Sequence, residues 1–313
     1  MDRCRFAPTT SGPAHPGTLL AGLLCWLDAR SRGAWLGLRL EDIDHTRCTR
    51  ESAADMRAAL DWFGLDWDDV SLQSDRDSEH ASALTLLSEC GVIYPCRCSR
   101  SEVQRVGDRA ADGGYRYPET CRDRALPDAD WRGCGEVLRL RLEPGVIPLV
   151  DEGGLDLSQD PAAAMGDPVL LRKDGAVTYH LAAVVDDAAQ GVTRIIRGRD
   201  IAAATAIHVT LQRLLRAATP TYRHHLLLLE ERGEKLAKLH GAVAWHSLRN
   251  HYTPHALCGF LAHAVGLRTV PAAVTPRELL EDFDWAKVGR GDPVLRWTGS
   301  ELRVVGSRPA GSE

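Results

Sequence analysis

No apolar run in this sequence approaches the length of a membrane span. The amino terminus also lacks a charged segment followed by an apolar one, so a secretory signal is not expected there. The nine cysteines are an odd number, and most stand singly in apolar surroundings, a pattern typical of reduced core thiols. Internal repeats and low-complexity tracts are missing as well. These absences predict a cytoplasmic location.

An excess of positive charge is also lacking. The 313 residues carry a formal net charge of −5, so the chain as a whole does not indicate nucleic-acid binding. Any RNA contact would need a local basic patch. Two groups of arginines could supply one, although each could equally be a solvated face: Arg97, Arg100, Arg105 and Arg109, and Arg213, Arg216 and Arg223.

The first part of the chain alternates between strand and helix patterns. A short strand is expected at 5–8, a helix at 17–30 ended by Gly33, a strand at 35–40 and an amphipathic helix at 51–63 ended by Gly64. This order is typical of an α/β fold with a parallel sheet flanked by helices. We therefore expect a doubly wound parallel sheet.

The length predicts about two domains. Residues 94–150 are rich in turns and interrupt the rhythm, so they are expected to form an inserted subdomain between two halves of a catalytic domain, 1–93 and 151–245. The second half carries helix–sheet patterns at 177–187 and 192–197, a helix at 201–217 and a strand at 225–229. Residues 246–305 are predicted to be helical, and 306–313 a disordered tail.

His15 and Gly17 lie in a Pro/Gly-rich turn between the first predicted strand and the first predicted helix. Glycines there allow the backbone to approach a ligand, and the helix offers unpaired N–H groups and a positive dipole end. A histidine at this position could donate a hydrogen bond to a phosphate. The alternative is an ordinary surface histidine.

Lys235 and Lys238 form the second phosphate-handling segment, on a predicted loop. Lysines on loops are commonly only solvated, so neither segment is persuasive alone. A doubly wound sheet would bring the two segments into one crevice. The hypothesis that follows is ATP-driven activation of an amino acid.

The chain resembles the class I aminoacyl-tRNA synthetases of the glutamyl type. The resemblance runs in order from about residue 4 to 245 and depends on five segments: 5–18, 39–44, 179–187, 196–200 and 235–239. Segments 8–18 and 235–239 resemble the two signatures of that class. The resemblance implies a Rossmann-type catalytic domain, activation of glutamate by ATP with Mg²⁺, and a tRNA partner.

Two positions depart from the signatures. Thr18 stands where many of these synthetases carry a second histidine, and Ala237 stands where a serine is usual. A hydrogen bond to a charged group contributes about 1.5–3 kcal/mol, so these changes should slow activation without abolishing it.

The resemblance also implies residue roles. His15, Lys235 and Lys238 would stabilise charge during catalysis, and ATP would contact His15, Gly17, Thr18 and Lys238. Arg5 and Glu41 would hold the two ends of glutamate, and Arg197 would bind its side-chain carboxylate. The rest of the glutamate pocket would be Phe6, Ala7, Pro8, Thr9 and Tyr179.

Without the resemblance, several of these residues have plainer interpretations. Glu41 and Arg47 could form a salt-bridged strand end, and Tyr179 could be a core aromatic. Asp42 and Asp44 are expected to be structural or capping residues.

Cys96 and Cys98 differ from the other cysteines because only one residue separates them. Two thiolates this close can share a zinc ion if loops supply two more ligands, although Cys-x-Cys alone is a weak signal. The resemblance implies a structural zinc site of Cys96, Cys98, Tyr117 and Cys121. Cys134 and His180 are the rival fourth ligands.

Only 75 residues follow Lys238, too few for the large anticodon-reading region of ordinary glutamyl-tRNA synthetases. The chain thus resembles a truncated branch of the glutamyl-type synthetases, which attaches glutamate to the queuosine base in the anticodon of tRNA(Asp). The protein is expected to be a monomer. The alternatives are a catalytic module that charges the tRNA 3′ end, a catalytically weak regulatory or binding homologue, and a nucleotidyltransferase acting on a small metabolite.

Overall fold

A computed structural model describes residues 1–127, 130–233 and 243–309. The chain divides into two compact units. Unit 1 contains Met1–Leu72, Arg194–Arg199 and Arg223–Glu313, and unit 2 contains Gln73–Thr193 and Asp200–Tyr222.

A five-stranded sheet in the order β3-β2-β1-β7-β8 is the centre of unit 1. Its strands are β1 (Arg3–Phe6), β2 (Trp35–Leu40), β3 (Asp69–Leu72), β7 (Arg194–Gly198) and β8 (Thr221–His225), the last of which begins in unit 2. β1 pairs in parallel with both β2 and β7, and β2 pairs in parallel with β3. The predicted α/β fold with a parallel sheet is confirmed.

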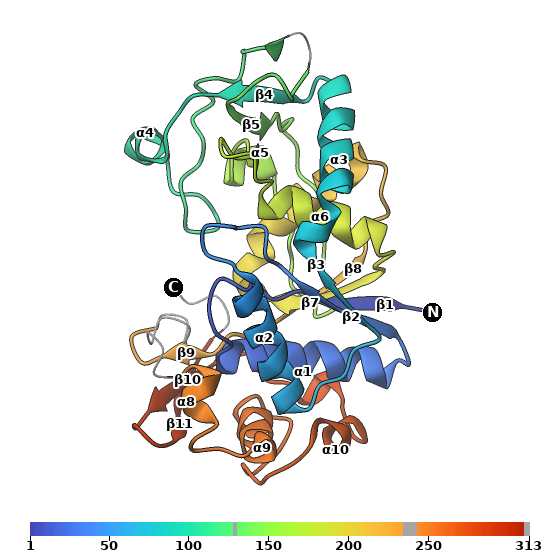
Figure 1. The fold of residues 1–313 in the computed structure, drawn as a ribbon. Coiled ribbons are helices and arrows are strands. Elements are labelled where there is room, and N and C mark those ends of the chain that lie inside the picture. The colour runs from blue at the N-terminus through green and yellow to red at the C-terminus, as the bar shows by residue number, and fades with distance from the viewer. Residues whose placement is uncertain (128–129, 234–242, 310–313) are drawn as a thin grey trace. The chain divides into compact units, whose positions relative to one another are not determined.

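Helix α1 (Pro16–Ser31) packs against β1, β2 and β7 (Figure 1). It is apolar on all sides, and α10 (Pro276–Leu280) lies against it too, which explains why most of its residues are buried. α2 (Arg50–Phe63) begins at the capping residue Thr49 and ends at Gly64, whose φ of 90° favours glycine. These helices follow the predicted bounds within one residue.

The carboxyl-terminal part of unit 1 is less helical than predicted. It contains α8 (Trp245–Leu248), α9 (Pro254–Ala264), the 3₁₀ turn η5 (Trp285–Lys287) and a three-stranded sheet in the order β11-β10-β9. β9 spans Leu229–Glu230, β10 spans Asp292–Trp297 and β11 spans Leu302–Arg308. The β10–β11 hairpin contradicts the helical prediction for 246–305. It also shortens the predicted tail, because residues 306–308 pair with β10.

The predicted strand at 225–229 is wrong in its position. β8 ends at His225 and β9 starts at Leu229, so residues 226–228 belong to neither strand. Continuous apolar character misled the prediction, since Leu226 and Leu228 are buried in the hydrophobic core without strand pairing.

Unit 2 is built around an antiparallel sheet in the order β4-β5-β6. Its elements are the 3₁₀ turn η1 (Gln73–Arg76), α3 (Asp77–Glu89), β4 (Ile93–Cys96), α4 (Arg100–Val106), β5 (Val137–Leu140), α5 (Pro161–Ala164), β6 (Val169–Leu171), α6 (Tyr179–Ala189), the 3₁₀ segment η3 (Arg199–Ala204, whose first residue belongs to unit 1) and α7 (Thr205–Leu214). Helix α6 packs against α3, α7 and β6. Unit 2 is therefore larger than the insertion expected at 94–150, because α3, α6 and α7 share one apolar core with this sheet.

Among the described helices, none combines the length and the apolar character needed to cross a lipid bilayer.

Candidate functional site

His15 is the N-cap of α1 and is held by the helix that it starts. Its Nδ1 accepts a hydrogen bond from the backbone N–H of Gly17 at 3.1 Å. Burial lowers the pKa of His15 from its ordinary 6.5 to about 4, so the ring is neutral at pH 7. Because Nδ1 is the acceptor, the proton lies on Nε2, which is the nitrogen able to donate to a ligand.

Gly17 is required by this arrangement. A Cβ atom at this position would lie 2.9 Å from Cε1 of His15, closer than side chains tolerate. The sequence predicts that Gly17 lets the backbone approach a ligand. The structure adds a second reason for a glycine here, because the His15 imidazole packs where a Cβ atom would lie. Thr18 follows as the next residue of α1.

Three residues predicted to bind glutamate lie at or near the carboxyl ends of adjacent strands in unit 1. Arg5 is the third residue of β1, Arg197 the fourth of β7, and Glu41 directly follows β2. Carboxyl ends of neighbouring parallel strands meet at one edge of a sheet, where ligands bind in such folds. Arg5 and Arg197 are 4% and 6% exposed, which is low for arginines and is typical of specific partners.

The segment before His15 is tied to Glu41. The Glu41 backbone N–H donates to the Pro8 carbonyl, and the Thr10 N–H donates to the Glu41 carbonyl, each at 3.0 Å. Thr9 and Glu41 thereby form a parallel bridge beyond the ends of β1 and β2. These hydrogen bonds fix the backbone of residues 8–10 against Glu41, and a segment that lines a binding pocket needs such a fixed position. Phe6 differs: its side chain stacks on Trp67 in the core, with centroids 5.9 Å apart.

Arg39 is a neighbour of Glu41 that sequence reasoning missed. Its Nη2 lies 3.4 Å from Oε1 of Glu41, and its side chain is fully buried in β2. Residues two apart on a strand point to the same side, so the i, i+2 spacing of opposite charges was the available signal. Arg47 instead pairs with Asp44, with Nη2 2.6 Å from Oδ2, in agreement with the structural role expected for Asp44.

Arg197 also has a partner that the sequence did not indicate. Its Nε donates to Nε2 of His224 on β8 at 3.0 Å. Both residues belong to unit 1.

Tyr179 lies in unit 2, as the first residue of α6. Its ring packs 5.3 Å from that of His208 and 5.8 Å from that of His180. Nδ1 of His180 lies 3.4 Å from Nε2 of His208. Tyr179 is thus part of an aromatic cluster whose two histidines the sequence did not connect with it.

Lys235, Ala237 and Lys238 lie outside the described residues. The described chain resumes at Val243, and Trp245 donates its backbone N–H to the carbonyl of Ala14 at 2.8 Å. Trp245 is buried, and its indole Nε1 lies 3.1 Å from both carboxylate oxygens of Asp55 on α2.

A separate cluster in unit 2 has the composition of a metal site. The three sulfur atoms of Cys96, Cys98 and Cys121 lie within 4.8 Å of one another. Cys98 Sγ is 3.8 Å from Cys121 Sγ, and the Tyr117 hydroxyl oxygen is 3.4 Å from Cys96 Sγ and 3.7 Å from Cys98 Sγ. Zinc bound tetrahedrally at about 2.3 Å from sulfur holds thiolates about 3.8 Å apart. The donor set therefore fits a zinc ion.

The electrostatics of this cluster favour a thiolate at one position. Burial raises the pKa of Cys121, but hydrogen bonds from the Arg97 backbone N–H, the Tyr117 hydroxyl and the neighbouring thiols outweigh that effect, and the pKa falls to about 7. The two rival ligands are elsewhere in unit 2: Cys134 packs against the apolar core that contains Leu84, and His180 lies next to His208.

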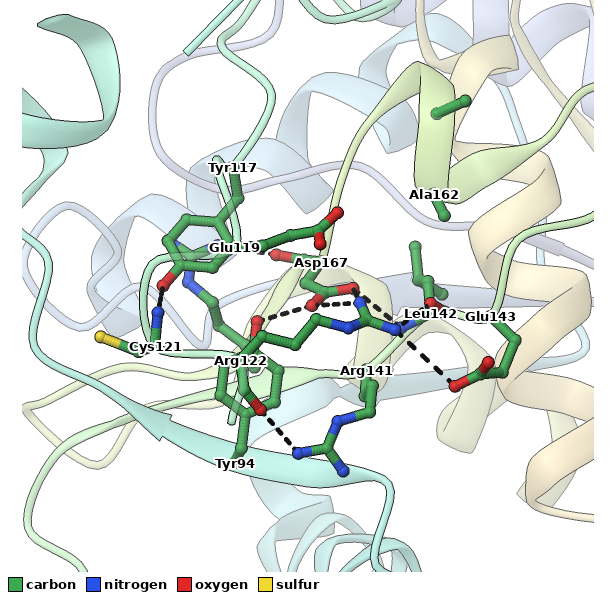
Figure 2. A network of polar contacts seen from close by, with 12 residues as sticks. Tyr94, Tyr117, Glu119, Cys121, Arg122, Arg141, Leu142, Glu143, Ala162 and Asp167 are labelled. Atoms are coloured by element: carbon green, nitrogen blue, oxygen red, sulfur yellow. Dashed lines mark hydrogen bonds and ion pairs between the residues drawn. The ribbon is translucent and has the colours of Figure 1, made fainter. Parts of the chain in front are cut away.

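The loop that carries Cys121 is anchored by the buried carboxylate of Asp167 (Figure 2). Arg122 donates from Nη1 to both oxygens of Asp167 at 2.7 Å, and Tyr94 donates its hydroxyl to Oδ2 at 2.6 Å. Arg122 also donates from Nη2 to the Leu142 carbonyl at 2.6 Å. These bonds fix the residue next to Cys121 against strand β4 and the segment after β5.

Residues 2–287 match the family described as tRNA synthetases class I (E and Q), catalytic domain. A glutamyl-Q tRNA(Asp) synthetase of Symbiobacterium thermophilum is 39% identical over 93% of this chain and 94% of its own length. One from Nocardia farcinica is also 39% identical, over 94% of this chain and 93% of its own.

Solved structures agree on the fold. A glutamate-tRNA ligase of Elizabethkingia meningosepticum superposes with a TM-score of 0.74 at 24% identity, over 92% of this chain but only 65% of that one. A glutamate-tRNA synthetase of Elizabethkingia anophelis gives a TM-score of 0.75, with 92% and 66% of the two chains covered. The chain spans about two thirds of these structures and nearly all of the two glutamyl-Q relatives named above. It belongs to the class I tRNA synthetases (E and Q), and within them to the family of the glutamyl-Q tRNA(Asp) synthetases.

Proposed function

We propose that this chain activates L-glutamate with ATP and transfers it to the queuosine base in the anticodon of tRNA(Asp). It is a ligase-type enzyme, as its family implies. The observation that carries the choice of acceptor is the match over more than nine tenths of both chains to proteins of that name.

In the first step, the α-carboxylate oxygen of glutamate attacks the α-phosphorus of ATP. A bond forms between them, the bond from the α-phosphorus to the bridging oxygen breaks, and pyrophosphate leaves. Negative charge grows on the phosphate oxygens, and the neutral His15 ring can donate from Nε2 to one of them. Mg²⁺ bound with the nucleotide would offset part of this charge. Thr18, at the start of α1, would offer its backbone N–H to ATP, and Gly17, whose own N–H is bonded to His15, would let the backbone approach the nucleotide. Lys235 and Lys238 would add positive charge.

Glutamate would lie at the carboxyl edge of β2, β1 and β7. Arg5 binds a carboxylate, Glu41 binds the ammonium group, and Arg197 binds the side-chain carboxylate. The support is that three buried guanidiniums, those of Arg5, Arg39 and Arg197, lie near this edge with the Glu41 carboxylate. Arg39 pairs with Glu41, so Arg5 and Arg197 are the two cations proposed for the two carboxylates of glutamate. Residues 7–9 supply backbone groups. For Tyr179, which belongs to unit 2, a role as a further glutamate contact rests on the family resemblance alone.

In the second step, a hydroxyl of the queuosine cyclopentene ring attacks the carbonyl of the adenylate. The ester bond forms, AMP leaves, and the hydroxyl proton passes to solvent or to the departing phosphate. A side-chain general base is not required by so reactive an acyl group.

The cluster of Cys96, Cys98, Tyr117 and Cys121 would hold one structural zinc ion. Bound there, the ion crosslinks a loop-rich segment that lacks a large core of its own. The donor distances above support this assignment. A cytoplasmic location and a monomeric state remain predictions.

Transfer of labelled glutamate to purified tRNA(Asp), with and without queuosine, tests the proposal. We expect labelling only of the queuosine-containing tRNA, retained after removal of the 3′-terminal adenosine. Labelling that requires the terminal adenosine would instead identify a module that charges the 3′ end.

Glutamate-dependent pyrophosphate exchange without RNA separates the enzyme from a catalytically weak regulatory or binding homologue. If no exchange is seen even at high enzyme concentration, the chain is better described as the regulatory or binding homologue. Exchange with other acids in preference to glutamate would favour a nucleotidyltransferase.

A further inference from the structure

The contact between Arg197 and His224 joins two neighbouring strands of the central sheet. Arg197 is on β7 and His224 is on β8, and the two strands are adjacent in the order of the sheet. The Arg197 Nε–H donates to His224 Nε2 at 3.0 Å. Arg197 is buried and His224 is partly buried. The residues are 27 apart in the sequence, so only the sheet brings them together.

The chemistry of the two groups determines the state of His224. A guanidinium can donate hydrogen bonds but cannot accept them, so the ring nitrogen that faces Nε must carry a lone pair. In this contact His224 is therefore neutral and carries its proton on Nδ1. A protonated ring would have no acceptor at Nε2 and would place two cations 3.0 Å apart.

A neutral acceptor orients an arginine without cancelling its charge. The arginine side chain has several rotatable bonds, and holding Nε fixes the plane of the guanidinium, whose two Nη nitrogens form a separate edge suited to bidentate contact. A carboxylate at the same place would orient the plane equally well. It would also neutralise the cation and compete with any carboxylate ligand.

We propose that His224 is a positioning residue, which fixes the plane of Arg197 for bidentate binding of the substrate side-chain carboxylate and leaves its positive charge undiminished. This inference rests on the proposed function, in which Arg197 binds that carboxylate. Its effect is on glutamate affinity, since His224 is assigned no role toward the phosphates of ATP.

The test compares His224→Gln with His224→Glu, which have the same shape and differ in charge. Gln offers a neutral oxygen near the position of Nε2, and Glu offers a charged one. Pyrophosphate exchange gives KM for glutamate, KM for ATP and kcat, and thermal unfolding shows whether each variant is folded. His224→Leu removes the acceptor.

We expect His224→Gln to keep KM for glutamate within about 3-fold of the wild type. His224→Leu should raise it by about 10-fold or more, the effect of one hydrogen bond to a charged group. His224→Glu should raise it at least as much, although it restores an acceptor and keeps the protein as stable. KM for ATP and kcat should change less than 3-fold in all three.

If the contact were purely structural, His224→Glu would keep KM for glutamate as close to the wild-type value as His224→Gln does, because either side chain would restore the acceptor. Glutamate affinity that is normal in His224→Glu or in His224→Leu overturns the inference. If Arg197→Lys already has a high KM, adding His224→Leu should change it little, and an additive effect would also overturn the inference. Absence of glutamate-dependent exchange in the wild type would instead refute the proposed function itself.

Discussion

The backbone N–H of Trp245 donates to the carbonyl of Ala14, with 2.8 Å between the two atoms. Ala14 precedes His15, and Trp245 follows Lys238 by seven residues. Trp245 is the third described residue after the lysine segment, and it is hydrogen-bonded to the turn that presents His15. This contact supports the proposal that both segments serve one nucleotide.

Asp55 on α2 should stabilise this contact. Its carboxylate accepts from the Trp245 indole and lies 2.8 Å from Nε2 of His246. In Asp55→Ala the buried indole N–H loses its acceptor, so we expect a loss of about 1–2 kcal/mol in the free energy of unfolding and a higher KM for ATP. Urea unfolding and pyrophosphate exchange measure the two effects.

Asp61→Ala is the matched control on the same helix. Asp61 pairs only weakly with Arg57, at 3.6 Å, with both side chains more than half exposed. Its removal should change stability by less than about 0.5 kcal/mol. Equal losses in the two variants would contradict the role given to Asp55.

His15 should affect stability in a defined range of pH. Its pKa is about 4 in the folded chain and 6.5 when unfolded, so the unfolded state binds the proton more readily. The contribution of the neutral ring is complete above pH 6.5 and is lost as the pH falls toward 4. Compared with His15→Asn, which keeps an N-cap, the wild type should lose about 1–3 kcal/mol more between pH 7 and pH 4.

Urea unfolding of both proteins at several pH values measures that difference, since the other titrating groups cancel. A constant difference between the curves would show that the His15 pKa is not lowered.

Gly17→Ala should displace the imidazole of His15. The added methyl would lie 2.9 Å from Cε1 of the ring, and Gly17 also donates the hydrogen bond that orients the ring. We expect a loss of about 10-fold or more in kcat for pyrophosphate exchange, corresponding to one misplaced charge-assisted hydrogen bond. The melting temperature should change little, because alanine favours helix formation.

Gly12→Ala provides the steric control in the same turn, because no described residue other than its two chain neighbours has an atom within 4 Å of a Cβ at that position. Its melting temperature should equal that of the wild type. Normal exchange by Gly17→Ala would argue against the place of His15 in catalysis.

Metal analysis should find one zinc ion per chain. Cys98→Ser should lose it and unfold at a lower temperature, since Cys98 lies 3.8 Å from Cys121 Sγ and 3.7 Å from the Tyr117 hydroxyl. Cys134→Ser should keep the zinc, because Cys134 packs in a different apolar cluster. Full zinc content in Cys98→Ser, or its loss in Cys134→Ser, would require a different ligand set.

Local patterns were sufficient for the elements around the first turn. Helices α1 and α2 and strand β2 lie where periodicity and the stop signals Gly33 and Gly64 predicted them. The β10–β11 hairpin was missed although Thr298, Gly299 and Ser300 lie among the four residues between its strands and could have indicated a turn. A stretch of weak alternation is hard to distinguish from a helix until its partner strand is known.

The sequence by itself determined the parallel α/β architecture, the residue types of each candidate site, and the resemblance that linked them. These depend on spacing within a few residues. Only the tertiary structure decided which partner each site residue has: Arg39 beside Glu41, His224 on Arg197, and Trp245 on Ala14. The last two join strands and turns distant in sequence, and such contacts follow from strand order and core packing, which no local pattern encodes.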